Sequence, residues 1–116
     1  MNIEEFRNFC LTLNCVTEEF PFDSNTLVFK VAGKMFALAG VEEFNGINLK
    51  CDPEKALELR EHYPAVQPGF HMSKKHWNTV QIDGSISNDL LQEWIKDSYH
   101  LVISKLPKKI QQELAL

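Results

Sequence analysis

The sequence predicts an α+β domain in which an antiparallel sheet of about five strands carries its helices on one face. Two observations lead to this fold class. Apolar residues recur every three or four positions near both ends of the chain, as in helices, whereas parts of the middle alternate apolar and polar residues, as in strands. Short turns separate several strand-like segments, which favours antiparallel pairing. The expected order is α-β-β-β-β-α-β-α, with a further short helix at the end.

Length and composition indicate one soluble domain spanning residues 1–116. The chain is 44% hydrophobic and 24% charged, both ordinary values for a globular protein. It has no apolar run near the ~20 residues that cross a membrane, and its acidic, amphipathic start is unlike a signal peptide. Three cysteines without a CxxC pair fit free thiols. We therefore expect a cytoplasmic location.

The first two helices are predicted from their N-terminal signals. Asn2 and Glu5 have capping-box spacing at the start of a helix expected over Ile3–Leu13. In Asp52-Pro53, the aspartate is a good N-cap and proline suits the first helical position. This second helix is expected to run to about His62.

The third helix is expected over Asn88–Lys105, with Ser87 as its N-cap. Pro107 ends or kinks it, because proline lacks the amide hydrogen that a helix interior needs. Ile110 and Leu114 then indicate a last short helix.

The strands are predicted from alternation and from turn residues. Gly33 suits a tight hairpin turn between the second and third strands, and the segment Tyr63–Met72 reads as an ordered loop because it holds two prolines and a glycine. The expected strands are Glu18–Phe22, Thr26–Val31, Lys34–Ala39, Gly46–Lys50 and Trp77–Asp83.

Charge is distributed unevenly along the chain. The net charge is −4, which argues against a generic nucleic-acid binder. Residues 1–63 carry 6 basic and 11 acidic side chains, a net of −5, whereas residues 64–116 carry 6 basic and 5 acidic, a net of +1. Any surface that faces an anion is therefore expected in the second half.

The segment Lys74–Asn78 is the leading candidate for a functional surface. Lys74 and Lys75 could neutralise phosphates, and Trp77, beside His76, could stack on a base or wedge between steps. Asn78 could donate to a phosphate or a base edge. The alternative interpretation is structural: Trp77 packs in the core and the lysines are simply solvated.

A second basic pair, Lys108 and Lys109, follows Pro107. It could extend a basic strip, or it could interact only with the carbonyl groups at the end of the preceding helix.

The sequence holds no recognisable catalytic or metal-binding motif. His71 and His76 are five residues apart and no HExxH occurs, so their spacing does not match a helical zinc pair. GxSxG, P-loop and GxGxxG motifs are also missing from the sequence. We expect a protein that is not an enzyme and has no cofactor.

Several short motifs together point to a family. They are Asn48-Leu49-Lys50-Cys51-Asp52-Pro53, Tyr63-Pro64, Pro68-Gly69-Phe70-His71-Met72, Lys75-His76-Trp77, Asp83-Gly84, Ser98-Tyr99 and Leu106-Pro107-Lys108-Lys109, with Lys30-Val31-Ala32-Gly33-Lys34-Met35-Phe36-Ala37 before them. This combination resembles the MmcQ/YjbR family of small bacterial proteins over essentially the whole chain.

The resemblance implies a frataxin-like (CyaY-like) α+β fold, also described as a double wing, and a DNA-binding or regulatory role. The residues that it assigns to nucleic-acid binding are Lys74, Lys75, His76, Trp77, Asn78, Lys108 and Lys109. One alternative is a module that binds a protein or an anionic ligand with the same loop and uses Trp77 as its anchor. Another is frataxin-like iron binding, which the acidic first half would suit.

Overall fold

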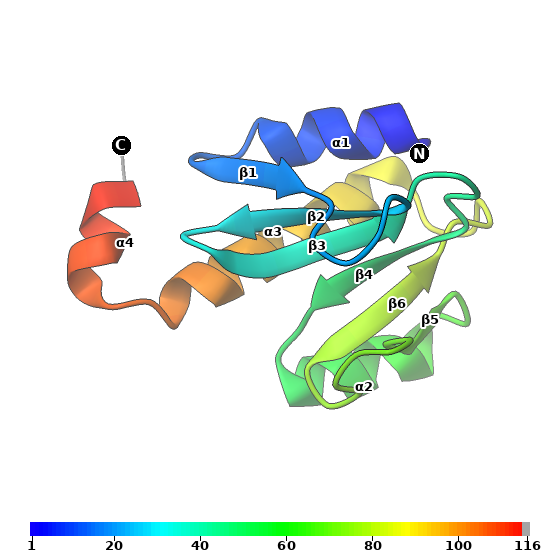
Figure 1. Cartoon of the computed structure of the whole chain (residues 1–116). Coiled ribbons are helices and arrows are strands. Elements are labelled where there is room, and N and C mark those ends of the chain that lie inside the picture. Colours follow the sequence, from blue (N-terminus) through cyan, green and yellow to red (C-terminus); the bar gives the residue numbers. More distant parts are fainter. Residues whose placement is uncertain (115–116) are drawn as a thin grey trace.

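The computed structural model describes residues 1–114, which form one sheet and four helices (Figure 1). The strands are β1 (Val16–Glu19), β2 (Thr26–Val31), β3 (Lys34–Gly40), β4 (Gly46–Lys50), β5 (Val66–Pro68) and β6 (Trp77–Gln81). The helices are α1 (Ile3–Leu11), α2 (Pro53–His62), α3 (Asn88–Ser104) and α4 (Lys108–Leu114).

The sheet has the strand order β1-β2-β3-β4-β6-β5, and every neighbouring pair is antiparallel. Helix α2 and strand β5 separate β4 from β6 along the chain, so β6 returns to pair with β4 in the middle of the sheet. The predicted α+β class and antiparallel pairing are confirmed. The expectation of about five strands is corrected to six.

The additional strand is β5, in the segment that the sequence predicted as a loop. Val66 pairs with Val80, and Pro68 pairs with Asn78 at the other end of this three-residue strand. A proline cannot donate to a sheet ladder, but an edge strand tolerates it because one side of the strand has no partner. The sequence analysis missed β5 because the strand is only three residues long and contains a proline.

The first strand was also predicted too far along the chain. It covers Val16–Glu19, and not Glu18–Phe22. Phe20 and Phe22 lie beyond it and are 48% and 64% exposed, so they do not form its buried face. Pro21, between them, has no amide hydrogen with which to continue the ladder.

The hairpin between β2 and β3 and the helix starts follow their local signals. Ala32 and Gly33 both have positive φ, 49° and 77°, as a two-residue hairpin turn of type I′ requires. Asp52 accepts from the amides at the start of α2, and Ser87 accepts from the Leu90 amide of α3. No helix in residues 1–114 is long and apolar enough to cross a membrane.

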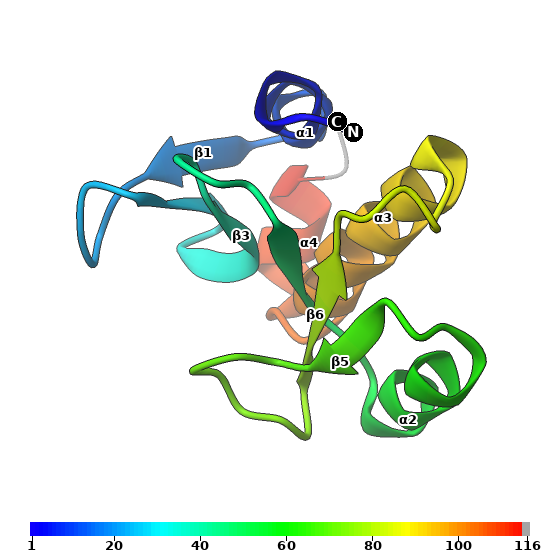
Figure 2. The same cartoon turned by 90° about the vertical axis from the view of Figure 1, so that its right-hand side faces the viewer.

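Helices α1, α2 and α3 cover one face of the sheet (Figure 2). Phe6 of α1 packs edge-on against Phe29 of β2, with 5.3 Å between ring centroids, and Ile95 of α3 is fully buried in the same core. Leu59 of α2 packs against the same core. The expected placement of helices on one face is therefore confirmed for these three.

In the described part of the chain, residues 1–114, the opposite face of the sheet carries no helix and only a small apolar cluster. Val28, Leu38 and Trp77 are buried there, with Met35 and Met72 packed against them. Met72 belongs to the loop that connects β5 to β6, so this loop covers part of the second face.

A buried hydroxyl group joins α3 to the centre of the sheet. Ser98 is completely buried; its Oγ donates to the carbonyl oxygen of Phe36 at 2.6 Å and accepts from the amide of Lys50 at 2.9 Å. One side chain thus satisfies polar groups of both β3 and β4, and fixes α3 against the end of β4.

We expect Ser98→Ala to lower the free energy of unfolding by about 1–3 kcal/mol, because it leaves two backbone groups of the sheet without their partner. Urea unfolding measures this directly. Ser104→Ala is the matched control: Ser104 is exposed and donates within its own helix, to the carbonyl of Leu101, so we expect a change within about 0.5 kcal/mol. Equal losses in the two variants would contradict the role given to Ser98.

Candidate functional site

The segment Lys74–Asn78 spans the end of the loop between β5 and β6 and the first two residues of β6. The carbonyl oxygen of Ser73 accepts from the amides of His76 and Trp77, at 3.2 and 2.9 Å, which folds the loop into a turn just before the strand. Lys74, Lys75 and His76 are exposed, whereas the strand residues are not. The predicted site is thus divided between a surface part and an interior part.

Trp77 belongs to the interior part. Its side chain is 7% exposed and lies in the apolar cluster on the second face of the sheet. Gly69 lies so close to it that an added Cβ atom would be 2.9 Å from the Trp77 Cβ. The sequence led us to expect an indole ring that could stack on a base, but the ring of Trp77 is buried in this structure. Trp77 anchors the loop instead, as the structural interpretation predicted.

Asn78 is also interior, at 2% exposure, and points to the helix-covered face. Its Oδ1 accepts from Arg60 Nε at 2.7 Å, and its Nδ2 donates to the carbonyl oxygen of Ala56 at 3.4 Å. The oxygen and the nitrogen of the side-chain amide both form hydrogen bonds inside the protein. Asn78 was expected to donate to a phosphate or a base edge at the surface, but in this structure its side chain is buried.

Arg60 of α2 fixes the position of the whole segment. Besides Asn78, its guanidinium group donates through Nη2 to the carbonyl oxygen of Trp77 at 3.3 Å and to the carbonyl oxygen of Lys74. One planar cation thus joins α2 to both the loop and the strand. The sequence analysis missed this residue, because its partners lie 14 to 18 positions away along the chain.

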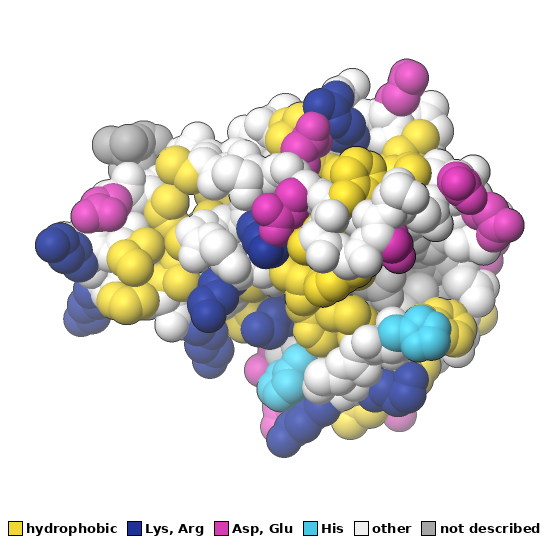
Figure 3. All heavy atoms as spheres, in the orientation of Figure 1, with side chains coloured by type: hydrophobic (Ala, Val, Ile, Leu, Met, Phe, Trp, Pro, Cys, Tyr) yellow, Lys and Arg dark blue, Asp and Glu magenta, His cyan; other side chains and the backbone are white. Residues whose placement is uncertain are grey.

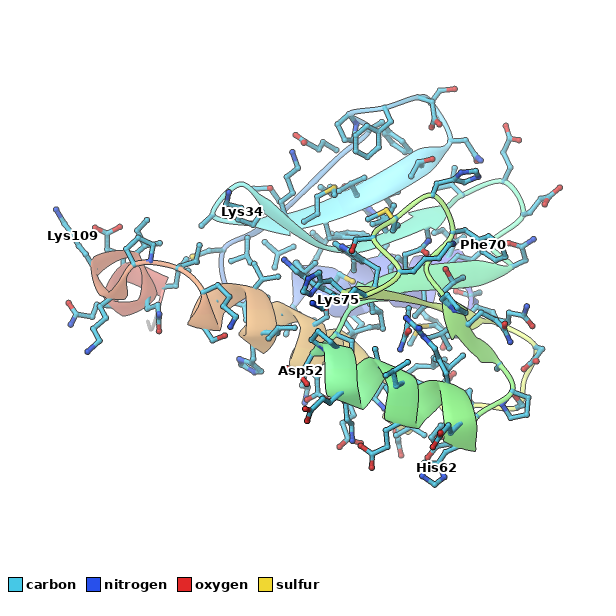
Figure 4. The ribbon with its side chains drawn as sticks, turned by 90° about the horizontal axis from the view of Figure 1, so that it is seen from below. Lys34, Asp52, His62, Phe70, Lys75 and Lys109 are labelled. Carbon is cyan, nitrogen blue, oxygen red and sulfur yellow. The ribbon has the colours of Figure 1, made fainter. Side chains whose placement is uncertain are left out.

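The two lysines of the segment differ in their surroundings. Lys74 Nζ donates to the carbonyl oxygen of Gly69 at 3.1 Å, so its charge is directed back onto its own loop. Lys75 is exposed, and Figure 4 shows it near the middle of the molecule, between Lys34 and the first turn of α2 at Asp52. Lys75 is therefore better placed than Lys74 to meet an anion.

A hollow beside this loop brings together basic side chains from three elements. Lys50 ends β4, His76 precedes β6, and Lys105 caps the C-terminus of α3. All three line a cavity of about 250 Å³, together with Cys51, Asp52, Pro53, Ser73, Trp77 and Leu101. The carboxylate of Asp52 already accepts two amides at the start of α2. The hollow is therefore predominantly cationic.

We define the basic edge as Lys34, Lys50, Lys75, His76, Lys105, Lys108 and Lys109. In Figure 3 most lysine and arginine side chains gather at the lower left, over the tip of the β2–β3 hairpin, the end of α3, and α4, whereas most acidic side chains lie toward the upper right. Helix α4 buries none of its residues and leaves Lys108 and Lys109 exposed. On this face of the molecule, the fold therefore brings lysines of the β2–β3 hairpin, the end of α3 and α4 to one side (Figure 3).

The cysteines and acidic residues do not form a reactive or metal-binding group. Burial, and after it the charge of Asp52, raises the pKa of the Cys51 thiol, and burial raises the pKa of Cys10 above its usual range. Both shifts favour the less reactive thiol form. Within residues 1–114, no three His, Cys, Asp or Glu side chains converge as metal ligands would.

Comparison with known proteins places this geometry in a family. The family model described as YjbR matches residues 11–101. The chain is 40% identical to uncharacterized protein YbdF of Escherichia coli O157:H7, over 96% of this chain and 92% of that protein. It is 30% identical to uncharacterized protein YjbR of Escherichia coli K12, over 94% and 93%.

A solved structure shares the fold. The crystal structure of Deinococcus radiodurans protein DR2400 superimposes with a TM-score of 0.92, covers 99% of this chain and 88% of that one, and has 40% sequence identity. The similarity therefore covers the whole fold, while the names of the relatives assign no activity.

We expect Arg60→Lys to loosen the loop before β6. A lysine keeps the positive charge, but its ammonium group lacks the planar set of donors with which the guanidinium group bonds Asn78 and two backbone carbonyl groups. Amide exchange at Gly69, His76 and Trp77 should accelerate about tenfold or more, since bonds to charged groups contribute ~1.5–3 kcal/mol.

Arg7→Lys is the control for this measurement. Arg7 is likewise held through its guanidinium group, which donates two bonds to the carboxylate of Glu18, but it lies at an exposed site on α1. It should leave exchange in the loop unchanged. If Arg60→Lys also leaves it unchanged, Arg60 does not hold the loop.

Proposed function

This chain belongs to the YjbR family, and we propose that it is a non-enzymatic protein that binds double-stranded DNA through the basic edge. The observation that carries the proposal is the hollow in which Lys50, His76 and Lys105 meet. Separate elements supply these side chains, and Lys75, Lys108 and Lys109 add exposed lysines on the adjoining loop and on α4, which follows α3. Cations gathered in this way can neutralise successive phosphates and release their counterions.

The composition of the basic edge favours contacts with the DNA backbone. It consists of lysines and one histidine, and its neighbouring tryptophan and asparagine are buried. Lysines contact phosphates mainly as point charges, whereas sequence is read by groups that reach base edges. We therefore propose modest sequence preference and strong salt dependence. Because the protein carries a net charge of −4, the rest of its surface attracts DNA only weakly.

A second candidate is a module that binds another protein with the same loop. Burial removes Trp77 as its anchor, but Phe70 at the other end of the loop is 60% exposed. An exposed aromatic ring beside a rigid turn is a reasonable interface residue. Retention of a partner from cell lysate after nuclease treatment, and its loss in Phe70→Ser, would favour this candidate over DNA.

The frataxin-like, double-wing description and its iron-binding alternative stay predictions. An iron site would need several metal-ligating side chains close together. Within residues 1–114, no three His, Cys, Asp or Glu side chains come together in this way. We therefore prefer the proposal based on lysines to the one based on carboxylates.

We expect a short DNA duplex to bind at low salt and to be released as salt rises. With four phosphate contacts, affinity should fall about 100-fold between roughly 50 and 200 mM salt. Lys75→Glu and Lys105→Glu should each weaken binding and lower the salt slope by about 1 or more. Fluorescence anisotropy with a labelled duplex measures both quantities.

Lys96→Glu is the matched control, because it makes the same change of charge at an exposed position in the middle of α3, outside the hollow. It should weaken binding much less than the two edge variants. No binding at low salt, or equal effects of all three changes, would overturn the proposal.

A further inference from the structure

A second cavity lies on the helix-covered face, between α2 and α3. It has a volume of about 190 Å³. Leu49 of β4 and Val80 of β6 form its floor, while Leu59 of α2 and Trp94 and Leu101 of α3 form its sides. These five side chains are all apolar, so this compartment favours an apolar occupant.

One wall of this apolar compartment is fixed by an aromatic contact. The Trp94 ring meets Tyr63 edge-on, with 5.1 Å between centroids and 73° between planes. Trp94 is 7% exposed. The compartment is thus lined by a side chain whose position is set by packing, which favours a cavity that exists before any ligand arrives.

The apolar compartment continues into the cationic hollow of the basic edge. Lys50, Cys51, Asp52 and Leu101 line both cavities. Cys51 is half-buried at this junction, where β4 gives way to α2. The two cavities therefore form one groove with an apolar end and a polar end.

The charges at the two ends differ. Around the apolar end, Lys50 and Lys55 are balanced by Asp52 and Asp97. The other end contains Lys50, Lys105 and His76 with Asp52 alone, and that carboxylate caps α2. A negative group in the groove would therefore be most favourable at the end formed by Lys50 and Lys105.

We propose that this groove binds a small organic carboxylate, with its apolar body between α2 and α3 and its carboxylate group at Lys50 and Lys105. The apolar compartment is smaller than the ~300–1,000 Å³ of pockets for drug-sized ligands, so a medium-length chain or one fused ring system is the expected body. Lys50 and Lys105 belong to the basic edge, but the body of the ligand would lie in the apolar compartment, so binding of the carboxylate can be measured without DNA.

The test uses octanoate and naphthalene-1-carboxylate as probes, without DNA. Each should slow alkylation of Cys51 in a saturable way, because the thiol lies where the two parts of the groove meet. Burial raises the pKa of Cys51, so the reaction is followed at mildly alkaline pH. Exposed Cys15, in the turn after α1, is the internal control and should react at an unchanged rate.

Charge and shape are tested separately. Octylamine, with the same chain and the opposite charge, should protect Cys51 at least about tenfold less well than octanoate. Lys105→Glu should raise the half-saturating concentration of octanoate about tenfold or more, whereas Lys96→Glu should not. Leu59→Phe, which narrows the apolar end and lies outside the cationic hollow, should weaken octanoate binding and leave duplex DNA binding intact.

Saturable protection with these preferences supports the groove even if the duplex does not bind. Protection by neither carboxylate, equal protection by octylamine, or an unchanged half-saturating concentration in Lys105→Glu would overturn the proposal. Because Lys105 is exposed, its variant keeps the test valid if Leu59→Phe fails to fold.

Discussion

The hydrogen bonds of Arg60 are the constraint on which the candidate site depends. Its guanidinium group joins α2 to the side chain of Asn78 and to the carbonyl groups of Lys74 and Trp77. A half-buried cation of this kind is stable only when several acceptors surround it. The arrangement turns Trp77 and Asn78 into structural residues and leaves Lys75 and His76 at the surface. Packing of the interior therefore decides which residues of the segment can contact a partner.

The same fold gives Lys50 and Lys105 two possible uses. Both line the cationic hollow, which belongs to the basic edge and is also the polar end of the groove that continues between α2 and α3. A carboxylate held there would neutralise cations that DNA phosphates would otherwise meet, so the two occupants would oppose each other. Ser98 contributes indirectly, because its bond to the amide of Lys50 fixes α3 beside the end of β4.

Local signals in the sequence were sufficient for most elements, but contacts between distant residues were not predictable. Asp52-Pro53 starts α2 and Ala32-Gly33 turns the hairpin, because capping and positive φ depend on neighbouring residues. Strand β5 was missed because its pairing with β6 is the only signal for three residues that include a proline. Burial of Trp77 depends on Val28 and Leu38, and Lys50 and Lys105 line one hollow because α3 packs beside the end of β4.

The most direct test of the central claim is a two-dimensional NMR titration of the ¹⁵N-labelled protein with a DNA duplex at low salt. Binding through the basic edge predicts that amide shifts change at Lys50, Lys75, His76, Lys105 and the start of α4, while α1 and β1 stay unchanged. Shifts centred on α1 and β1, or no shifts at all, would contradict the claim.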